Sequence, residues 1–228
     1  MKKIIAGLDL SLSSTGITLA FFEDDTLLQI KFFRVVFNKI PRPIKNINMV
    51  SYNIPNYIDS MFMVIDQDDK NNIDQLHYTV KAVQSSNKIN NIIFRSLKDF
   101  KPDLFIVSIE NYIMPDYGGA HQLKLVSALI SLQAFVRKHI IDICVSNKII
   151  LKMLTPTPTS LKLVFSGNGN ATKEDMVKAF INYYDGEKLL PQIKTISVDS
   201  INDIIDSFAL TMYAYKKCLD FDVSKLIM

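Results

Sequence analysis

The sequence is poor in the residues that build disulfide frameworks and zinc sites. Its 228 residues include two cysteines, Cys144 and Cys218, which lie far apart and follow no metal-ligand spacing. The three histidines are also scattered, so the sequence predicts no zinc site. So few and so widely separated cysteines favour a reduced, intracellular compartment. We therefore expect the cytoplasm, with a nucleoid or a viral replication site as further alternatives.

The sequence also lacks a long apolar run and a large excess of either charge. No uninterrupted apolar stretch is long enough to span a bilayer, and the apolar N-terminal run is broken at Asp9, so we reject a signal peptide. A net charge of +3 permits a nucleic-acid partner but does not argue for one. With 48% hydrophobic and 21% charged residues, residues 1–228 are expected to form one globular domain.

The apolar patterns predict an α/β fold with a mixed five-stranded sheet flanked by helices. The first three strands form an antiparallel meander, and helices and strands alternate later. Residues 38–72 are rich in Pro and Asn and form an insertion after the third strand, with short strands of their own around 47–52 and 58–65. Residues 156–171 are predicted to be a loop. The strands are expected at 3–9, 15–22, 27–37, 103–109 and 147–154, and the helices at 73–98, 118–141, from near Thr172, and at 200–217.

Four acidic residues stand where apolar structure should end. Asp9 closes the run KKIIAGLD, and Glu110 closes DLFIVSIE. Asp203 and Asp206 lie one helical turn apart in the last predicted helix. Carboxylates at the ends of buried elements are costly unless a cation joins them. Roughly four acids balance the charge of two divalent cations, so the pattern favours a two-metal phosphodiester site.

Each acid also has a simpler explanation. Asp9 follows a strand, where Asp often caps a turn with its side chain. Ser200 and Asp203 resemble a helix capping box, which explains Asp203 well and Asp206 poorly. Glu110 is harder to explain in this way, because glutamate is a poor turn residue.

Five segments, in this order, resemble the RuvC-like branch of the RNase H-like nucleases, the Holliday junction resolvases. They are GLDLSLSSTGITLA, FIVSIENY, LVSALISLQAFVRK, SLKLVFSGNGNATKEDMV and NDIIDSFAL. The resemblance covers most of residues 1–37 and 103–216, and it implies an RNase H-like fold. Each motif alone is weak, whereas five in order are fairly specific.

The resemblance implies that Asp9, Glu110, Asp203 and Asp206 hold two Mg²⁺ ions, for which Mn²⁺ substitutes. One ion would activate a water for in-line attack, and the other would stabilise the departing 3′ oxygen. Lys173 matches the family lysine beside the scissile phosphate, where a positive charge offsets the charge of the transition state. The simpler interpretation of Lys173 is a solvated residue in the first turn of a helix.

Further residues match the DNA-binding positions of the family. Lys162 matches its other basic residue in the same segment. Gly167 and Gly169 would let backbone amides approach a phosphate closely, although glycines also simply make turns. Tyr112 is a candidate for stacking on bases at the junction centre. The family aromatic stands one position later, where this sequence has Ile113.

The function implied by the resemblance is a structure-selective endonuclease that resolves four-way DNA junctions by paired phosphodiester hydrolysis. It would act as a homodimer through the helix at 118–141, because a junction offers two cleavable strands related by symmetry. One alternative is another RNase H-like nuclease that cuts branched DNA or an RNA–DNA hybrid. Less favoured are an actin-like ATPase, for which the sequence lacks a second Gly-rich phosphate segment, and an inactive DNA-binding scaffold.

Overall fold

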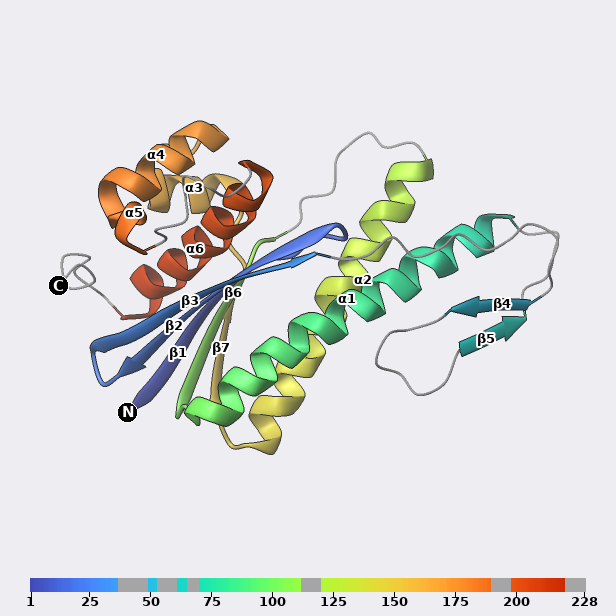
Figure 1. Cartoon of the computed structure of the whole chain (residues 1–228), viewed down its shortest axis with the longest axis horizontal. Coiled ribbons are helices and arrows are strands. Elements are labelled where there is room, and N and C mark those ends of the chain that lie inside the picture. Colours follow the sequence, from blue (N-terminus) through green and yellow to red (C-terminus); the bar gives the residue numbers. More distant parts are fainter. Residues whose placement is uncertain (37–48, 53–60, 65–69, 112–119, 190–197, 220–228) are drawn as a thin grey trace.

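A mixed five-stranded sheet forms the centre of the molecule (Figure 1). The computed structural model describes residues 1–36, 49–52, 61–64, 70–111, 120–189 and 198–219. The strand order is β3-β2-β1-β6-β7, in which β3, β2 and β1 are antiparallel and β1, β6 and β7 are parallel. The strands are β1 (Lys2–Asp9), β2 (Ser14–Glu23), β3 (Thr26–Val36), β6 (Leu104–Ile109) and β7 (Ile150–Leu154).

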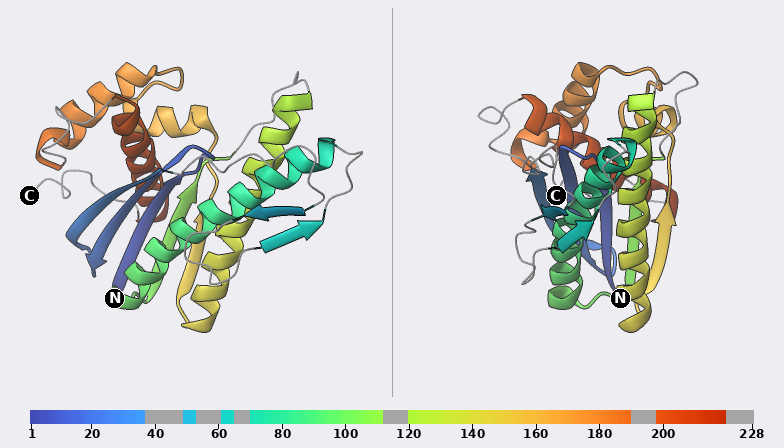
Figure 2. Two further views of the ribbon diagram at one scale, coloured as in Figure 1. Left: turned by 45° about the vertical axis from the view of Figure 1, so that its right-hand side comes forward. Right: turned by 90° about the vertical axis from the view of Figure 1, so that its right-hand side faces the viewer.

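Helices cover both faces of this sheet (Figures 1 and 2). Two long helices, α1 and α2, lie on one face, and α6 lies on the other with α3 and α4 packed against it. Mixed-sheet topology with helices on both faces is the RNase H-like arrangement that the sequence predicts. The bounds are α1 (Lys70–Phe100), α2 (Ala120–Ser146), α3 (Pro158–Ser166), α4 (Lys173–Tyr184), α5 (Gly186–Leu189) and α6 (Val198–Leu219).

Alternating side chains of the central strands build two separate cores. Ile4, Ala6 and Leu8 of β1 pack with α1 and α2, whereas Ile5 packs with α6. This alternation is the period of two expected for a strand covered on both faces. Consequently Asp9, which is at an odd position of β1 like Ile5, lies on the side of α6.

Phe208 anchors α6 in the core on its own side of the sheet. Its ring contacts three aromatic rings of α3 and α4, with centroids 5.1 Å from Phe180, 5.6 Å from Tyr184 and 6.0 Å from Phe165. Burial of such a ring contributes roughly 2–3 kcal/mol through its apolar surface. The start of α6, which carries Asp203 and Asp206, is thereby fixed over the sheet.

The insertion contains the two short strands predicted for it. β4 (Met49–Tyr52) and β5 (Met61–Val64) pair antiparallel with each other and form a small second sheet. Among the described residues, no helix combines the length and apolarity needed to cross a bilayer. The extent of one domain over residues 1–228 stays a prediction.

The structure corrects the prediction of a loop over 156–171, because residues 158–166 form helix α3. Thr157 caps its start by accepting a hydrogen bond from the Ser160 amide, and a proline stands in its first turn. Leu161 and Phe165, four residues apart, are buried against α6. Prolines before the segment and glycines after it suggest a loop, yet both are ordinary at helix ends. The predicted end of the helix at 141 and the predicted start of the next strand at 147 are also wrong. Helix α2 continues to Ser146, and β7 begins only at Ile150.

Candidate active site

Asp9 and Glu110 lie at the carboxyl ends of two neighbouring parallel strands. Leu8 of β1 is in register with Ile109 of β6, so the next residue on each strand is an acid. Both acids lie four residues beyond a side chain that packs toward α6, namely Ile5 and Ile106. The strand period therefore directs both carboxylates to the α6 side of the sheet.

Two glycines let α6 lie directly on the sheet beside these acids. A Cβ at Gly16 would overlap the backbone carbonyl of Asp203, and one at Gly7 would overlap that of Ser207. The hydroxyls of Thr18 and Ser207 share a buried hydrogen bond of 2.8 Å between β2 and α6. The close approach places Asp203 and the following turn of α6 at the end of the sheet where β1 and β6 finish.

The pKa of Asp9 shows that the other three acids lie close to it. Burial raises the pKa of Asp9 well above its ordinary value. The carboxylates that raise this pKa further are those of Asp206, Glu110 and Asp203. The ammonium of Lys173 acts in the opposite direction. Four acids from three elements distant in sequence therefore share one site with a lysine of α4.

Glu110 and Asp206 have raised pKa values for related reasons. Burial is the main cause for Glu110, followed by the charge of Asp206, while Lys162 opposes the rise. Burial also raises the pKa of Asp206 to about 6, against the lowering effect of Lys173 and Lys162. Both predicted lysines thus lie within electrostatic reach of the acids.

The turn between α3 and α4 sets the positions of the two lysines. Lys162 lies within α3, and Lys173 is the first residue of α4. Thr172 caps α4 and forms a capping box with Asp175, in which each side chain binds the other residue's amide. The first turn of α4 is therefore firmly built, and it carries the Lys173 side chain at its exposed start.

The two predicted phosphate-approach glycines have structural roles in this turn. Gly167 ends α3 in the left-handed region, with φ of 80°, where glycine is favoured. A Cβ at Gly169 would come within 2.9 Å of the Thr159 methyl carbon, so Gly169 closes the turn against α3. Contact of either glycine with DNA stays a prediction.

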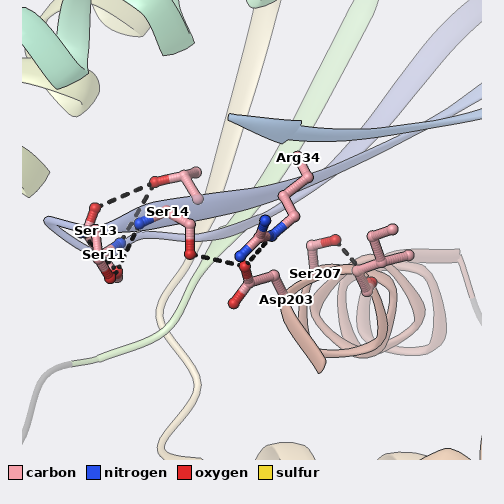
Figure 3. Close-up of polar contacts among 8 residues, drawn as sticks. Ser11, Ser13, Ser14, Arg34, Asp203 and Ser207 are labelled. Atoms are coloured by element: carbon pink, nitrogen blue, oxygen red, sulfur yellow. Dashed lines mark hydrogen bonds and ion pairs between the residues drawn. The ribbon is translucent and has the colours of Figure 1, made fainter. Parts of the chain in front are cut away.

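Asp203 does not have the helix-capping role that Ser200 and Asp203 suggest in the sequence. Helix α6 already begins at Val198, so Ser200 lies inside the helix. The Asp203 carboxylate instead accepts hydrogen bonds from two strands, as Figure 3 shows. Ser14 Oγ of β2 lies 2.7 Å from its Oδ2, and Arg34 Nε of β3 lies 2.6 Å from the same oxygen. The simple capping interpretation of Asp203 is therefore wrong.

Sequence reasoning did not single out Arg34 or Gln133. Arg34 is the one charge in the otherwise apolar run FFRVVF, which is a signal that could have been used. Gln133 of α2 donates from Nε2 to the backbone carbonyl of Glu110 at 3.2 Å.

A pocket of about 220 Å³ opens beside the acids, lined by Asp9, Leu10, Glu110, Asn111, Leu129, Gln133 and Pro158. A larger hollow of about 580 Å³, between β3 and α1, contains none of the four acids.

The chemistry of this donor set fits Mg²⁺ or Mn²⁺, because all four side chains offer hard carboxylate oxygens. Raised pKa values in a group of like charges are the condition that a bound dication relieves. As the side chains stand, no three Asp, Glu, His or Cys residues in the described ranges form a closed set around one ion. In this state the Asp203 carboxylate is bound by Arg34 and Ser14. Tyr112 and Ile113, the candidates for base stacking, lie outside the described residues.

Comparisons with known proteins find likeness in structure alone. No protein-family model matches the sequence, and no curated protein matches it. Among solved structures, Thermus thermophilus RuvC is similar, with 12% identity, a TM-score of 0.46 and coverage of 96% of this chain and 97% of that one. The same protein in complex with a Holliday junction substrate has 10% identity and a TM-score of 0.45, and the match covers 95% of each chain. The yeast mitochondrial Holliday junction resolvase Ydc2 has 13% identity and a TM-score of 0.48, and the match covers 97% of this chain and 79% of that one.

The names of these solved structures are those of the resolvase family that the five sequence segments resemble. Membership of that family stays a prediction from the sequence. The RNase H-like fold is confirmed, and it is visible in the strand order of the sheet itself. Identities of 10–13% with TM-scores of 0.45–0.48 say nothing about chemistry.

Proposed function

We propose that this protein is a divalent-metal-dependent endonuclease that cuts phosphodiester bonds in four-way DNA junctions. One observation carries the proposal: Asp9, Glu110, Asp203 and Asp206 gather at one end of the sheet, where burial and neighbouring carboxylates raise the pKa of Asp9, Glu110 and Asp206, and two lysines lie beside them. Such a collection of like charges destabilises the metal-free protein. A site of this kind is explained by a function that requires cations.

Asp9, Glu110, Asp203 and Asp206 are the proposed ligands, and each must be ionised to serve as one. When bound, the two ions supply an activated water and stabilisation of the departing 3′ oxygen. Lys173 and Lys162 then face the phosphate and offset the negative charge that grows on it during the reaction. The pocket beside Asp9 and Glu110 leaves room at the ligands for a phosphate of the substrate.

A homodimer through α2 is the second part of the proposal. Leu132, Val136 and Ile140 of this helix are buried in the core. Its other side exposes an apolar stripe, in which Ile141 is 44% and Val145 72% exposed. Ile130, Ala134, Ile141 and Val145 make up this stripe, at spacings of four, seven and four residues, and Arg137 and Lys138 lie within the seven-residue gap. Such a seam suits a second copy of the same helix, and two copies suit the two symmetric strands of a junction.

The test is cleavage of four labelled substrates in parallel: a four-way junction, a flap, an RNA–DNA hybrid and a linear duplex. Each is incubated with Mg²⁺ and, separately, with a chelator. The proposal expects symmetric nicking of the junction that depends on Mg²⁺. Preferential cutting of the hybrid would assign a different RNase H-like activity, and cutting that survives chelation would remove the metal from the mechanism.

A further inference from the structure

Arg34 reaches the acidic site across a strand that has no side chain in the way. It lies on β3 directly opposite Gly16 of β2, and Gly16 is the residue against which the Asp203 backbone packs. The guanidinium therefore starts opposite a position without Cβ. It meets the Asp203 carboxylate of α6, as Figure 3 shows. The arginine side chain is long, stays charged at all physiological pH values and offers its Nε–H as a donor.

Two donors bind the same oxygen of Asp203. Arg34 Nε is 2.6 Å from Oδ2, and Ser14 Oγ is 2.7 Å from it. Neither of these bonds involves Oδ1. A carboxylate oxygen has two good acceptor directions, so Oδ2 has no strong direction left for a cation. Asp203 can therefore offer a metal only Oδ1 unless Arg34 moves.

The pair lies in a setting where its charge matters. The Arg34 side chain is 28% exposed and that of Asp203 is 21% exposed, so water screens the contact only in part. Asp203 is also one of the carboxylates that act on Asp9. The fixed positive charge of Arg34 beside Asp203 thus reduces the negative potential that draws cations into the whole site.

We propose that Arg34 is a positioning residue that competes with a divalent cation for Oδ2 of Asp203 and so weakens cation binding at the α6 end of the site. The inference rests on the proposed function, because it takes Asp203 as a metal ligand. In the metal-free protein Arg34 partly neutralises the acids. When a cation binds, Arg34 gives up its bond to Asp203.

The first test is Mn²⁺ binding to the full chain without DNA, followed by calorimetry or by the signal of free Mn²⁺ in electron paramagnetic resonance. Replacing Arg34 with Gln removes the charge but keeps a polar side chain. We expect Arg34→Gln to bind Mn²⁺ about three- to ten-fold more tightly, as expected from loss of one unit charge several ångströms from the ion. Lys31→Gln is the matched control, since Lys31 is an exposed residue of the same strand, and it should bind like the unaltered protein. Ser14→Ala, which removes an uncharged donor from the same oxygen, should raise the affinity less than Arg34→Gln does, because no charge is lost.

A merely structural role would lower the melting temperature of Arg34→Gln and leave its Mn²⁺ affinity unchanged or weaker. That result would overturn the inference. The melting curve of each variant is therefore measured without metal beside the binding isotherm.

A second measurement uses the unaltered protein and does not depend on the folding of a variant. The chain has four arginines, so their side-chain Nε–H signals can be resolved by nuclear magnetic resonance. The Arg34 signal, assigned by its loss in Arg34→Lys, should shift and exchange faster with water when Mg²⁺ is added. An unchanged signal at saturating Mg²⁺ would show that the bond to Asp203 persists, which contradicts the competition.

The outcomes separate this inference from the proposed function. If the unaltered protein binds Mn²⁺ and cuts junctions but Arg34→Gln binds no more tightly, only the role of Arg34 fails. If Mn²⁺ binds, Arg34→Gln binds more tightly and no junction is cut, only the nuclease proposal fails. If the unaltered protein binds no Mn²⁺, both fail.

Discussion

Gly16 of β2 packs so closely on the Asp203 backbone that a single methyl group would not fit between strand and helix. This contact sets the height of α6 above the sheet, and with it the distance of Asp203 and Asp206 from Asp9. The geometry of the acidic site therefore depends on a residue that itself carries no chemistry.

Gly16→Ala should push α6 away from the sheet. We expect a loss of about 2 kcal/mol or more in the free energy of unfolding, because backbone rather than a flexible side chain meets the new methyl. Urea denaturation measures the loss, and Mn²⁺ affinity should fall with it. Gly167→Asn is the control, since Asn tolerates the left-handed conformation and an added Cβ there meets open space. Equal stability of Gly16→Ala and the unaltered protein would mean that α6 is not held by this contact.

Asp206→Asn should abolish cutting and yet stabilise the metal-free protein. The pKa of Asp206 rises to about 6 in the folded state, mainly through burial, so the folded state binds its proton more tightly than the unfolded state does. The unfolding free energy is then greatest below pH 4 for this group and declines as the pH rises toward 6 and beyond. An amide carries no charge and avoids this loss, so at pH 7.5 the variant should gain about 1–3 kcal/mol.

Thermal melts at pH 7.5 with a chelator measure this gain, and the same melts with Mg²⁺ give the control. Mg²⁺ should raise the melting temperature of the unaltered protein and have little effect on Asp206→Asn. A variant that is less stable than the unaltered protein without metal would contradict the assignment of Asp206 as a strained, buried acid.

Cation binding should weaken steeply as the solution becomes acidic. Asp206, with its pKa of about 6, and Asp9, whose pKa is also raised by burial and by three carboxylates, must lose their protons before they serve as ligands. Below pH 6, Mn²⁺ affinity should fall about ten-fold or more per pH unit, since at least one proton is released for each ion bound. Titration calorimetry between pH 5 and 7.5 in two buffers measures both the affinity and the protons released. A flat affinity over this range would exclude these acids as ligands.

Ile141→Glu should dissociate the proposed dimer. Ile141 lies in the exposed apolar stripe of α2, so in a symmetric pair each copy would bring a buried, unpaired charge to the interface. The dissociation constant should rise roughly ten-fold or more, as measured by sedimentation equilibrium. Phe94→Glu is the matched control, because Phe94 is 42% exposed but belongs to α1. If both variants and the unaltered protein sediment as one species of the same mass, the interface lies elsewhere or does not form.

The sequence predicted much of this fold because its strands and long helices have strong, regular patterns. The apolar alternation of β1 and the run that ends at Glu110 fix the central strands, and the segment of Asp203 and Asp206 has a clear helical period. Helix α3 escaped prediction since Pro158 stands in its first turn and Gly167 ends it, and both residue types also suggest a loop. Arg34 escaped because its partner lies 169 residues away, and only the pairing of β3 with Gly16 of β2 brings the two together.

Crystals grown with Mn²⁺ provide the most direct test of the central claim, through anomalous scattering from the bound ions. The account predicts two peaks about 3.5–4 Å apart, both contacted by carboxylates from the group Asp9, Glu110, Asp203 and Asp206. Peaks on other residues, or none beside these four in crystals that hold Mn²⁺, would contradict it.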